Sequence, residues 1–336
     1  MMMKKRIMRK ILFVLLPLVL ALFASCGEQK YDTPEDGPTF GNITISVDES
    51  FRPIFESQLE TFHSIYTQAK INVRYVSEAQ AVSDLVADSS RMIIISRELS
   101  AAENSEIERV KIYPSTIKAA YDAVALVAHK NNKQAFITYE QIEGILRGEI
   151  TNWRQVDRSL PSSEIQLIFD NYNSGIINYL KSRFGTDAFL KKNSFAVKSS
   201  EAVVDYVSKN TNALGFLGVN WISDSDDQKN LSFLKKISVL EVSNPDTSAK
   251  GGSYYQPFQA YIATKDYPLT RTVYMISREA RKGLAYGFMA FVASERGQRI
   301  ILKSGLVPAT MPIRLVEVRN ENFSIERDNN NENTKN

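Results

Sequence analysis

The chain contains almost none of the residues that build disulfides, zinc sites or histidine-based catalysis. It has one cysteine and two histidines among 336 residues. One cysteine forms no disulfide within a chain, and there is no cluster of Cys and His that could hold zinc. A Gly-x-Ser-x-Gly nucleophile motif and a P-loop are also missing. His63 and His129 lie inside predicted elements as packed or surface residues. We therefore expect no enzyme and no cofactor.

The sequence also lacks an apolar run long enough to span a bilayer, which takes about 20 residues. The longest run, from Ile11 to Phe23, follows five Lys and Arg residues and precedes Ala24-Ser25-Cys26. This order of charge, apolar run and small residues indicates a secretory signal over residues 1–25. Leu22 to Cys26 resembles a bacterial lipobox, with Phe23 as a departure. We expect cleavage before Cys26 and a membrane anchor of acyl chains on its thiol; the alternative is a short anchor that is never cleaved.

The net charge changes when the signal segment is removed. The whole chain carries a formal charge of +3, and the signal segment contributes five basic and no acidic residues, so the remainder carries −2. The calculated pI of 8.7 is therefore no evidence for nucleic-acid binding. We expect no nucleic-acid partner.

Polar segments flank the part of the chain that is expected to fold. Residues 26–40 contain Pro34 and Pro38 and are predicted to be a flexible tether. Residues 319–336 are rich in Asn, Glu, Asp and Lys and are predicted to be a disordered tail. The remaining residues are enough for two compact lobes.

Strands and helices alternate between these ends. Apolar residues at helical spacing alternate with short runs rich in β-branched residues. The predicted strands cover 42–47, 71–76, 92–95, 123–128 and 165–169, and the predicted helices begin near 53, 82, 100, 138 and 177. A capping-box signal marks Ser100, Thr138 begins the next helix, and Gly148 marks its end. Such alternation predicts an α/β fold with parallel sheets covered by helices, whose ligands lie at the carboxyl ends of strands.

Several motifs then occur in one order. Strand Asp122–His129 leads to Ile137-Thr138-Tyr139-Glu140-Gln141-Ile142 and to Leu146-Arg147-Gly148-Glu149-Ile150-Thr151-Asn152-Trp153, and later come Asn212 to Gly218, Ser294 to Gln298 and Gly305 to Pro308. Together they resemble the phosphate-binding proteins of ABC importers over roughly residues 41–313. The resemblance implies a type II periplasmic binding protein fold with two lobes and a cleft between them. It places lobe 1 at 41–118 and 257–318, and lobe 2 at 119–256.

The resemblance points to three strand-to-helix loops as the anion site. In the first, it implies that the Ser50 hydroxyl and the Phe51 N–H contact the ligand; the alternative is that Ser50 only caps the next helix. In the second, Ser96 falls near the cleft, and Arg97 offers a forked pair of N–H groups to an oxyanion. The alternative is that Arg97 pairs with Glu98 or Glu103 at the surface.

The third loop matches the family in part. Ser174 and Gly175 align with the family's glycine-containing loop, and Gly175 allows close backbone approach. Asp170 stands where many phosphate binders have arginine, and Ile176 stands where they have a threonine hydroxyl. A carboxylate about 4 Å from an anion repels it by about 4 kcal/mol at an effective dielectric near 20. We therefore expect Asp170 to turn away or to be neutral, and we hypothesise a charge-swapped pair in which Arg97 offsets Asp170.

Two functions follow from this interpretation. The first is a monomeric, lipid-anchored solute-binding protein of the bacterial cell envelope that captures phosphate or a related tetrahedral oxyanion for a membrane ABC permease. The second is an envelope lipoprotein of the same fold whose degenerate site senses an anion or acts as an interaction module. Asp170 and Ile176 favour the second. A phosphate-processing hydrolase has little support in the sequence.

Overall fold

The computed structural model describes residues 36–185, 193–224, 226–246 and 253–312. The predicted signal segment, Cys26, most of the tether and the tail from residue 319 lie outside the described residues. Among the helices described, none is long and apolar enough to cross a membrane.

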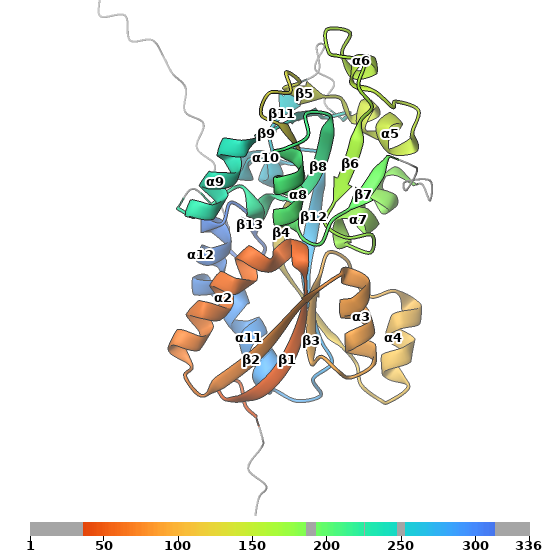
Figure 1. Ribbon diagram of the computed structural model, residues 1–336. Helices are drawn as coiled ribbons and strands as arrows, with labels where there is room; N and C mark the ends of the chain where they lie inside the picture. The colour runs from red at the N-terminus through yellow and green to blue at the C-terminus, as the bar shows by residue number, and fades with distance from the viewer. Residues whose placement is uncertain (1–35, 186–192, 225, 247–252, 313–336) are drawn as a thin grey trace, which may run out of the picture. The chain divides into compact units, whose positions relative to one another are not determined.

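Strands and helices alternate along most of the described chain, as Figure 1 shows. The strands are β1 (Gly41–Asp48), β2 (Ala69–Val76), β3 (Met92–Ile95), β4 (Ser115–His129), β5 (Phe136–Ile137), β6 (Gln166–Phe169), β7 (Ser194–Ala196), β8 (Ala213–Gly218), β9 (Ile237–Val239), β10 (Glu241–Ser243), β11 (Tyr254–Tyr255), β12 (Thr270–Ser277) and β13 (Val307–Pro308). The α-helices are α2 (Arg52–Ile65), α3 (Glu78–Val86), α4 (Ala101–Glu108), α5 (Tyr139–Arg147), α6 (Trp153–Val156), α7 (Gly175–Phe184), α8 (Ser200–Val207), α9 (Gln228–Lys236), α10 (Gln259–Thr264), α11 (Leu284–Ala293) and α12 (Glu295–Lys303). Two 3-10 helices, η1 (Glu49–Phe51) and η2 (Val219–Trp221), follow β1 and β8.

The main sheet is mixed, with the strand order β2-β1-β3-β12-β4-β8-β6-β7. β1 pairs in parallel with β2 and β3, and β6 pairs in parallel with β7 and β8. β12 and β4 run antiparallel to their neighbours. The long strand β4 pairs with β12 over Ser115–Ala123 and with β8 over Val124–Ala128, and thus joins the two parallel groups. The predicted α/β class is confirmed, and the sheet is mixed because antiparallel strands join the two parallel groups.

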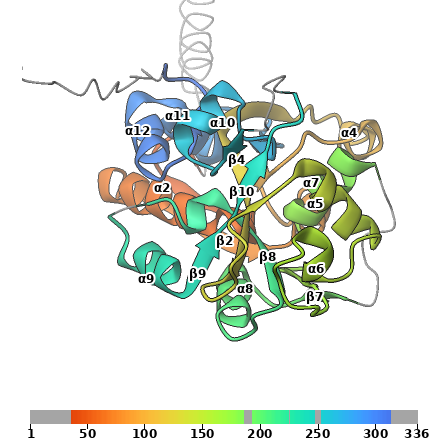
Figure 2. The same cartoon turned by 90° about the horizontal axis from the view of Figure 1, so that it is seen from above.

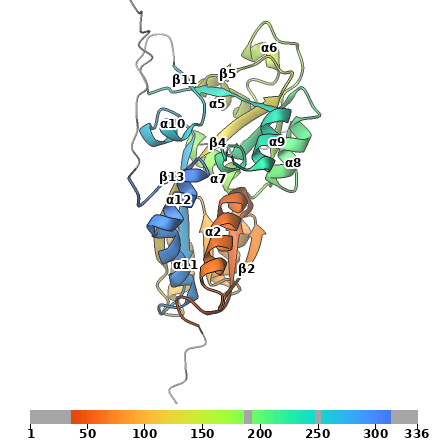
Figure 3. The same ribbon diagram turned by 90° about the vertical axis from the view of Figure 1, so that its left-hand side faces the viewer.

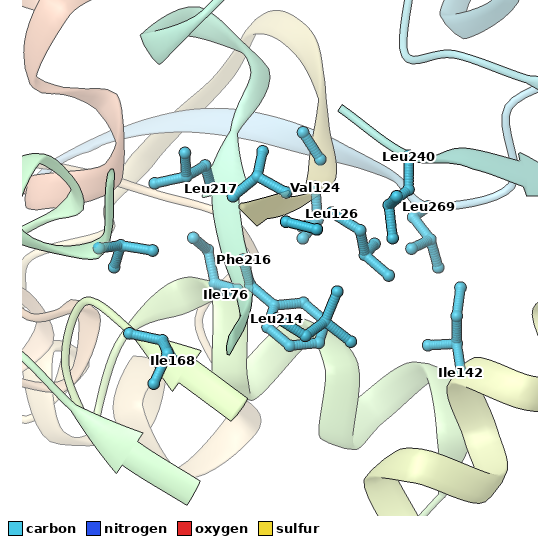
Figure 4. Packing of buried hydrophobic residues seen from close by; sticks show 14 of the residues in the cluster. Val124, Leu126, Ile142, Ile168, Ile176, Leu214, Phe216, Leu217, Leu240 and Leu269 are labelled. Carbon is cyan, nitrogen blue, oxygen red and sulfur yellow. The ribbon is translucent and has the colours of Figure 1, made fainter. Parts of the chain in front are cut away.

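Two large hydrophobic cores lie along this sheet. The first core joins β1 and β3 to α2, α11 and α12, and includes Phe51, Phe62 and Phe288. Figure 3 shows α11 and α12 beside α2, where the Gln58 side chain donates a hydrogen bond to the Gly297 carbonyl (2.7 Å). The second core joins the second half of β4 to α5, β6, α7, α8 and β8. In Figure 4, Leu214 and Phe216 of β8 lie among Ile142, Ile168 and Leu126.

Helices cover both faces of these strands. Successive strand residues point to opposite faces, so Met92 and Ile94 of β3 enter the first core, while Ile93 and Ile95 pack in a smaller cluster with Leu85 of α3. Around the group of β6, β7 and β8, α9 lies beside β9, and α5 to α7 lie on the opposite side of the sheet from α9, as Figure 2 shows. In the main sheet, each strand that has a parallel partner is followed along the chain by a helix.

The local signals for helix ends are confirmed. Ser100 and Thr138 each form a capping box, at the start of α4 and α5. Gly148 ends α5 in the left-handed conformation with φ 72°, which costs glycine little because it has no Cβ. Trp153 is buried in the second core, and its indole N–H donates to the Asn212 carbonyl (3.0 Å).

Candidate functional site

The loop after β1 turns the chain into α2 through η1. Asp48 caps this turn, and its Oδ1 accepts hydrogen bonds from the Ser50 N–H (2.9 Å) and hydroxyl (2.6 Å). Pro53 stands in the first turn of α2, where its missing N–H leaves no bond unmade. Asp48, Ser50 and Phe51 are all fully buried. The loop thus contains the predicted donors, but the Ser50 hydroxyl already donates to a neighbouring carboxylate.

The loop after β3 meets the start of α3. The Ser96 N–H and hydroxyl both donate to Glu78 Oε2, at 3.1 and 2.5 Å. The guanidinium of Arg97 donates to Glu78 Oε1 (3.2 Å) and to both carboxylate oxygens of Glu103 (2.8 Å each). The alternative expected for Arg97, pairing with Glu103, is what the structure contains, and Glu78 is a further partner. Glu78 is itself fully buried.

The loop after β6 presents the first turn of α7. Ser174 caps the helix, because its hydroxyl oxygen accepts from the Ile177 N–H. The Gly175 N–H donates to Asp48 Oδ2 (2.9 Å), across a separation of 127 residues. Ile176 is fully buried in the second core, as Figure 4 shows. The first turn of α7 thus points the Ile176 side chain into the core, and the assignment of Ile176 to the ligand site stays a prediction.

Gly175 is the point where the three loops meet. A Cβ at this position would lie 2.8 Å from Asp48 Oδ2, 2.8 Å from Ser96 Oγ and 2.9 Å from Glu78 Oε2. Real Cβ atoms essentially never approach other atoms this closely, so a larger residue would force these side chains to move. The sequence placed Ser50, Ser96 and Gly175 in one site, and the structure brings them together around this residue.

Asp170 lies at the end of β6, 2% exposed. Its Oδ1 accepts from the Asn171 N–H (2.9 Å), and its Oδ2 is buried with no hydrogen-bond partner among the described residues. Burial, together with the nearby carboxylates of Asp48 and Glu49, raises the pKa of Asp170 to about 8. At neutral pH this carboxyl is therefore mostly protonated and able to donate.

The cation of the site is a residue that the sequence did not single out. Arg271 of β12 is buried, and its Nε and Nη2 donate to Asp122 Oδ2 of β4 at 2.9 and 2.8 Å. Its Nη2 also donates to the Ser50 hydroxyl (3.0 Å), and its guanidinium lies 4.4 Å from the centre of the Phe51 ring. Its Nη1 is buried without a hydrogen-bond partner in the described part of the chain.

The charge-swapped pair of Arg97 and Asp170 is not formed. Arg97 gives its hydrogen bonds to Glu78, Glu103 and the Glu98 carbonyl, while Asp170 pairs with Asn171. The opposing charges at the site are instead Asp122 and Arg271. The physical reason is local: Glu103 is fixed by its own capping box within reach of Arg97.

The residues of η2 close the site from the side of β8. The Asn220 amide and the Trp221 indole both donate to the Ser50 carbonyl, at 2.9 and 3.0 Å. Glu49 accepts two further hydrogen bonds, from the N–H (3.1 Å) and hydroxyl (2.9 Å) of Ser200 at the start of α8. The loop that holds Ser50 is thus bound to both parallel groups of strands.

Asp48, Glu78, Asp122 and Arg271 were missed as site residues. A signal exists for Glu78, which follows the helix-capping Ser77 directly after a strand. For Arg271 the only signal is a charged residue in an alternating apolar strand. Despite the many carboxylates, no group of three or more His, Cys, Asp or Glu in the described ranges is arranged to hold a metal ion.

Comparison with known proteins gives a consistent result. A family model described as the PBP superfamily domain matches residues 32–296. The phosphate-binding protein PstS of Pseudomonas aeruginosa is 22% identical over 292 residues, covering 82% of this chain and 85% of that protein. PstS of Borreliella burgdorferi is 21% identical over 308 residues, covering 89% of this chain and 99% of that protein.

Solved structures show the same fold. An ABC-type phosphate transport receptor from Vibrio cholerae superposes with a TM-score of 0.59 at 24% identity, covering 81% of this chain and 100% of that one. A protein assigned as the substrate-binding protein of a phosphate ABC transporter from Clostridium perfringens, solved with bound phosphate, superposes with a TM-score of 0.66 at 22% identity. This superposition covers 80% of this chain and 99% of the Clostridium perfringens protein.

Proposed function

The chain belongs to the PBP superfamily, and from this premise we propose that it is a solute-binding protein that captures phosphate, or a related tetrahedral oxyanion, for an ABC importer. The relatives that it matches over most of their length are phosphate-binding proteins by name. The donors around Gly175 are of the kind that bind such a ligand: hydroxyls, backbone N–H groups at a helix start, and a guanidinium.

The observation that carries this proposal is the state of Arg271. The Asp122 carboxylate accepts hydrogen bonds from one side of the guanidinium, and the Ser50 hydroxyl oxygen accepts a hydrogen bond from Nη2. The buried Nη1 lacks a partner among the described residues. A buried donor left without a partner costs about 1–3 kcal/mol, and an oxyanion bound beside Ser50 would remove that cost.

The neutral carboxyl of Asp170 supports the same ligand class. With its pKa raised to about 8, Asp170 carries a proton at neutral pH. Its unpartnered Oδ2 can then donate to an oxyanion rather than repel it. This removes the main objection that the sequence raised against phosphate.

The test is calorimetric titration of the full-length protein with phosphate, sulfate, arsenate and molybdate. We expect phosphate binding by the wild type, and weaker binding by Arg271→Lys, which keeps the charge opposite Asp122 but loses the guanidinium fork. The expected loss of affinity is about tenfold to hundredfold, since a hydrogen bond to a charged group contributes about 1.5–3 kcal/mol.

The matched control is Arg278→Lys. Arg278 is also buried and directly follows β12, but it donates to the Leu85 and Val86 carbonyls, away from the site. Its substitution should leave phosphate affinity unchanged. If the wild type binds none of the four anions, or if both lysine variants weaken binding equally, the proposal is wrong.

A second candidate is an envelope protein of the same fold that does not capture an anion. One observation favours it: carboxylates of the chain itself, Asp48 and Glu78, already accept the hydrogen bonds of Ser50, Ser96 and Gly175. The same titration separates the two candidates, because only the first binds an oxyanion.

The cellular setting is part of the first proposal. The protein acts as a monomer in the bacterial envelope, held by acyl chains on Cys26, and passes its ligand to a membrane permease. Support comes from the signal-like N-terminus in the sequence and from the names of the relatives. No catalytic role is proposed.

A further inference from the structure

The described contacts give Glu78 an unusual environment for an ionisable side chain. It is fully buried, and both of its oxygens accept hydrogen bonds. Oε2 accepts from the N–H and hydroxyl of Ser96, and Oε1 accepts from Arg97 Nε and from the Asn178 amide (3.0 Å). A backbone N–H, a hydroxyl, a guanidinium and an amide around one anion form a complete oxyanion-binding set.

These partners come from two different parts of the protein. Ser96 and Arg97 follow β3, next to the first core, whereas Asn178 is on α7, which packs in the second core. Asp48 makes the equivalent link a few ångströms away, since its two oxygens accept from Ser50 and from the Gly175 N–H of α7. Both carboxylates therefore tie α7 to the strand ends of the first core.

The donors held in this way are the same ones that the proposed function assigns to phosphate. Ser50 and Gly175 are buried and Ser96 is half-buried, and their N–H and O–H groups donate to Asp48 and Glu78. An external oxyanion and these carboxylates cannot use the same N–H and O–H groups at once. The like charges would also repel.

We propose that Glu78 is an internal ligand of the anion site: its carboxylate holds α7 against the loop after β3, and a bound oxyanion must displace it. Glu78 thereby lowers the affinity for the oxyanion. The observed affinity is the intrinsic affinity of the open site, reduced by the free energy needed to break the hydrogen bonds of Glu78. The part of this inference that concerns the oxyanion rests on the proposed function; the part that concerns α7 does not.

The experiment compares full-length wild type with Glu78→Gln, which keeps the size of the side chain and removes its charge. Hydrogen exchange followed by mass spectrometry reports the Ser96 and Gly175 amides, over peptides covering 94–98 and 173–178. In phosphate-free buffer we expect exchange in both peptides to be at least about tenfold faster in the variant. The Ser96 N–H loses its charged acceptor, and α7, which carries Gly175, loses the link from Glu78 to the Asn178 amide. Titration with phosphate should give an affinity at least about tenfold tighter than that of the wild type.

Two further variants make the result specific. Glu103→Gln changes the other acidic partner of Arg97, which has no described contact with α7, and should leave exchange at 173–178 unchanged. Asn178→Ala removes the α7 partner alone, and should speed exchange at 173–178 even if Glu78→Gln does not fold.

The outcomes separate the two proposals. Equal exchange in wild type, Glu78→Gln and Asn178→Ala overturns the internal-ligand inference. Faster exchange with a phosphate affinity equal to that of the wild type overturns displacement by the oxyanion. Faster exchange in a protein that binds no anion, with or without Glu78, supports the internal ligand and shows that the proposed function is wrong.

Discussion

The candidate site contains more acidic side chains than we would expect of a site that binds an anion. The side chains of Asp48, Glu78, Asp122 and Asp170 are all buried, and the guanidinium of Arg271 is buried beside Asp122. Burial and the neighbouring Glu78 raise the pKa of Asp48, and burial raises the pKa of Asp170 to about 8. Protonation is thus one way in which the site limits its own negative charge.

Substitution of Asp170 by asparagine should change how stability depends on pH. The folded-state pKa of Asp170 is about 8, against an ordinary value of 3.8. Between these two pH values the folded protein holds a proton that the unfolded chain releases. The contribution of Asp170 to the free energy of unfolding therefore falls by about 1.4 kcal/mol for each unit by which the pH rises. Asp170→Asn keeps an oxygen for the Asn171 N–H and removes the titration. Its stability relative to wild type should rise from pH 5 to pH 8, measured by urea denaturation; parallel curves would contradict the assigned pKa.

Among the elements, α7 has the most consequence for function. Its first turn contacts loops from β1 and β3 and its body packs in the second core. Ser174 begins the helix and Gly185 ends it in the left-handed conformation, with φ 62°. The two glycines at its ends therefore serve different purposes. Gly175 allows the polar side chains of the neighbouring loops to approach the backbone, and Gly185 adopts a positive φ angle.

Alanine at each end of α7 should distinguish these purposes. Gly175→Ala places a Cβ within 2.9 Å of three polar atoms, and should lower the unfolding free energy by ~1–3 kcal/mol and abolish or strongly weaken phosphate binding. Gly185→Ala meets no atom within 4 Å, and should cost ~1–2 kcal/mol from its positive φ alone with binding unchanged. Denaturation and titration of both variants supply the check. Wild-type binding by Gly175→Ala would remove α7 from the site.

For the molecule as a whole, β4 and β12 are the connections between the two cores. The first core takes Ala119, Ala120 and Val273, and the second takes Ala123, Val124 and Leu269. Ile262 and Tyr267 also belong to the second core, where the Tyr267 hydroxyl donates to the Val124 carbonyl (2.7 Å). We therefore propose that the second lobe extends to about residue 269 rather than 256, and that the lobes hinge where these two strands pass between the cores.

Lipid anchoring of Cys26 is the prediction that concerns the whole molecule in the cell. Cys26→Ser removes the thiol that would carry the acyl chains, and should release the protein from membranes or leave its signal uncleaved. Fractionation of cells, with the mass of the N-terminal peptide, measures both. A processed Cys26→Ser protein that still partitions into membranes would contradict the anchor.

The sequence by itself determined part of the elements, some of their ends and the family. Capping at Ser100 and Thr138 and the end at Gly148 are decided within one helical turn, so local residues suffice to predict them. The three loops around Ser50, Ser96 and Gly175 were likewise found, because each stands at a strand end in a motif that resembles a known family. The lobe assignment stays a prediction.

Only the tertiary structure decided which charges meet at the site. Arg271 pairs with Asp122 across 149 residues, and Glu78 meets Asn178 across 100, because sheet order brings β12 beside β4 and places α7 over the ends of β1 and β3. The direction of Ile176 depends on the rotation of α7 about its axis, and the pKa of Asp170 depends on burial. Neither a helix rotation nor the exclusion of water is set by neighbours in sequence, since both arise from packing between distant segments.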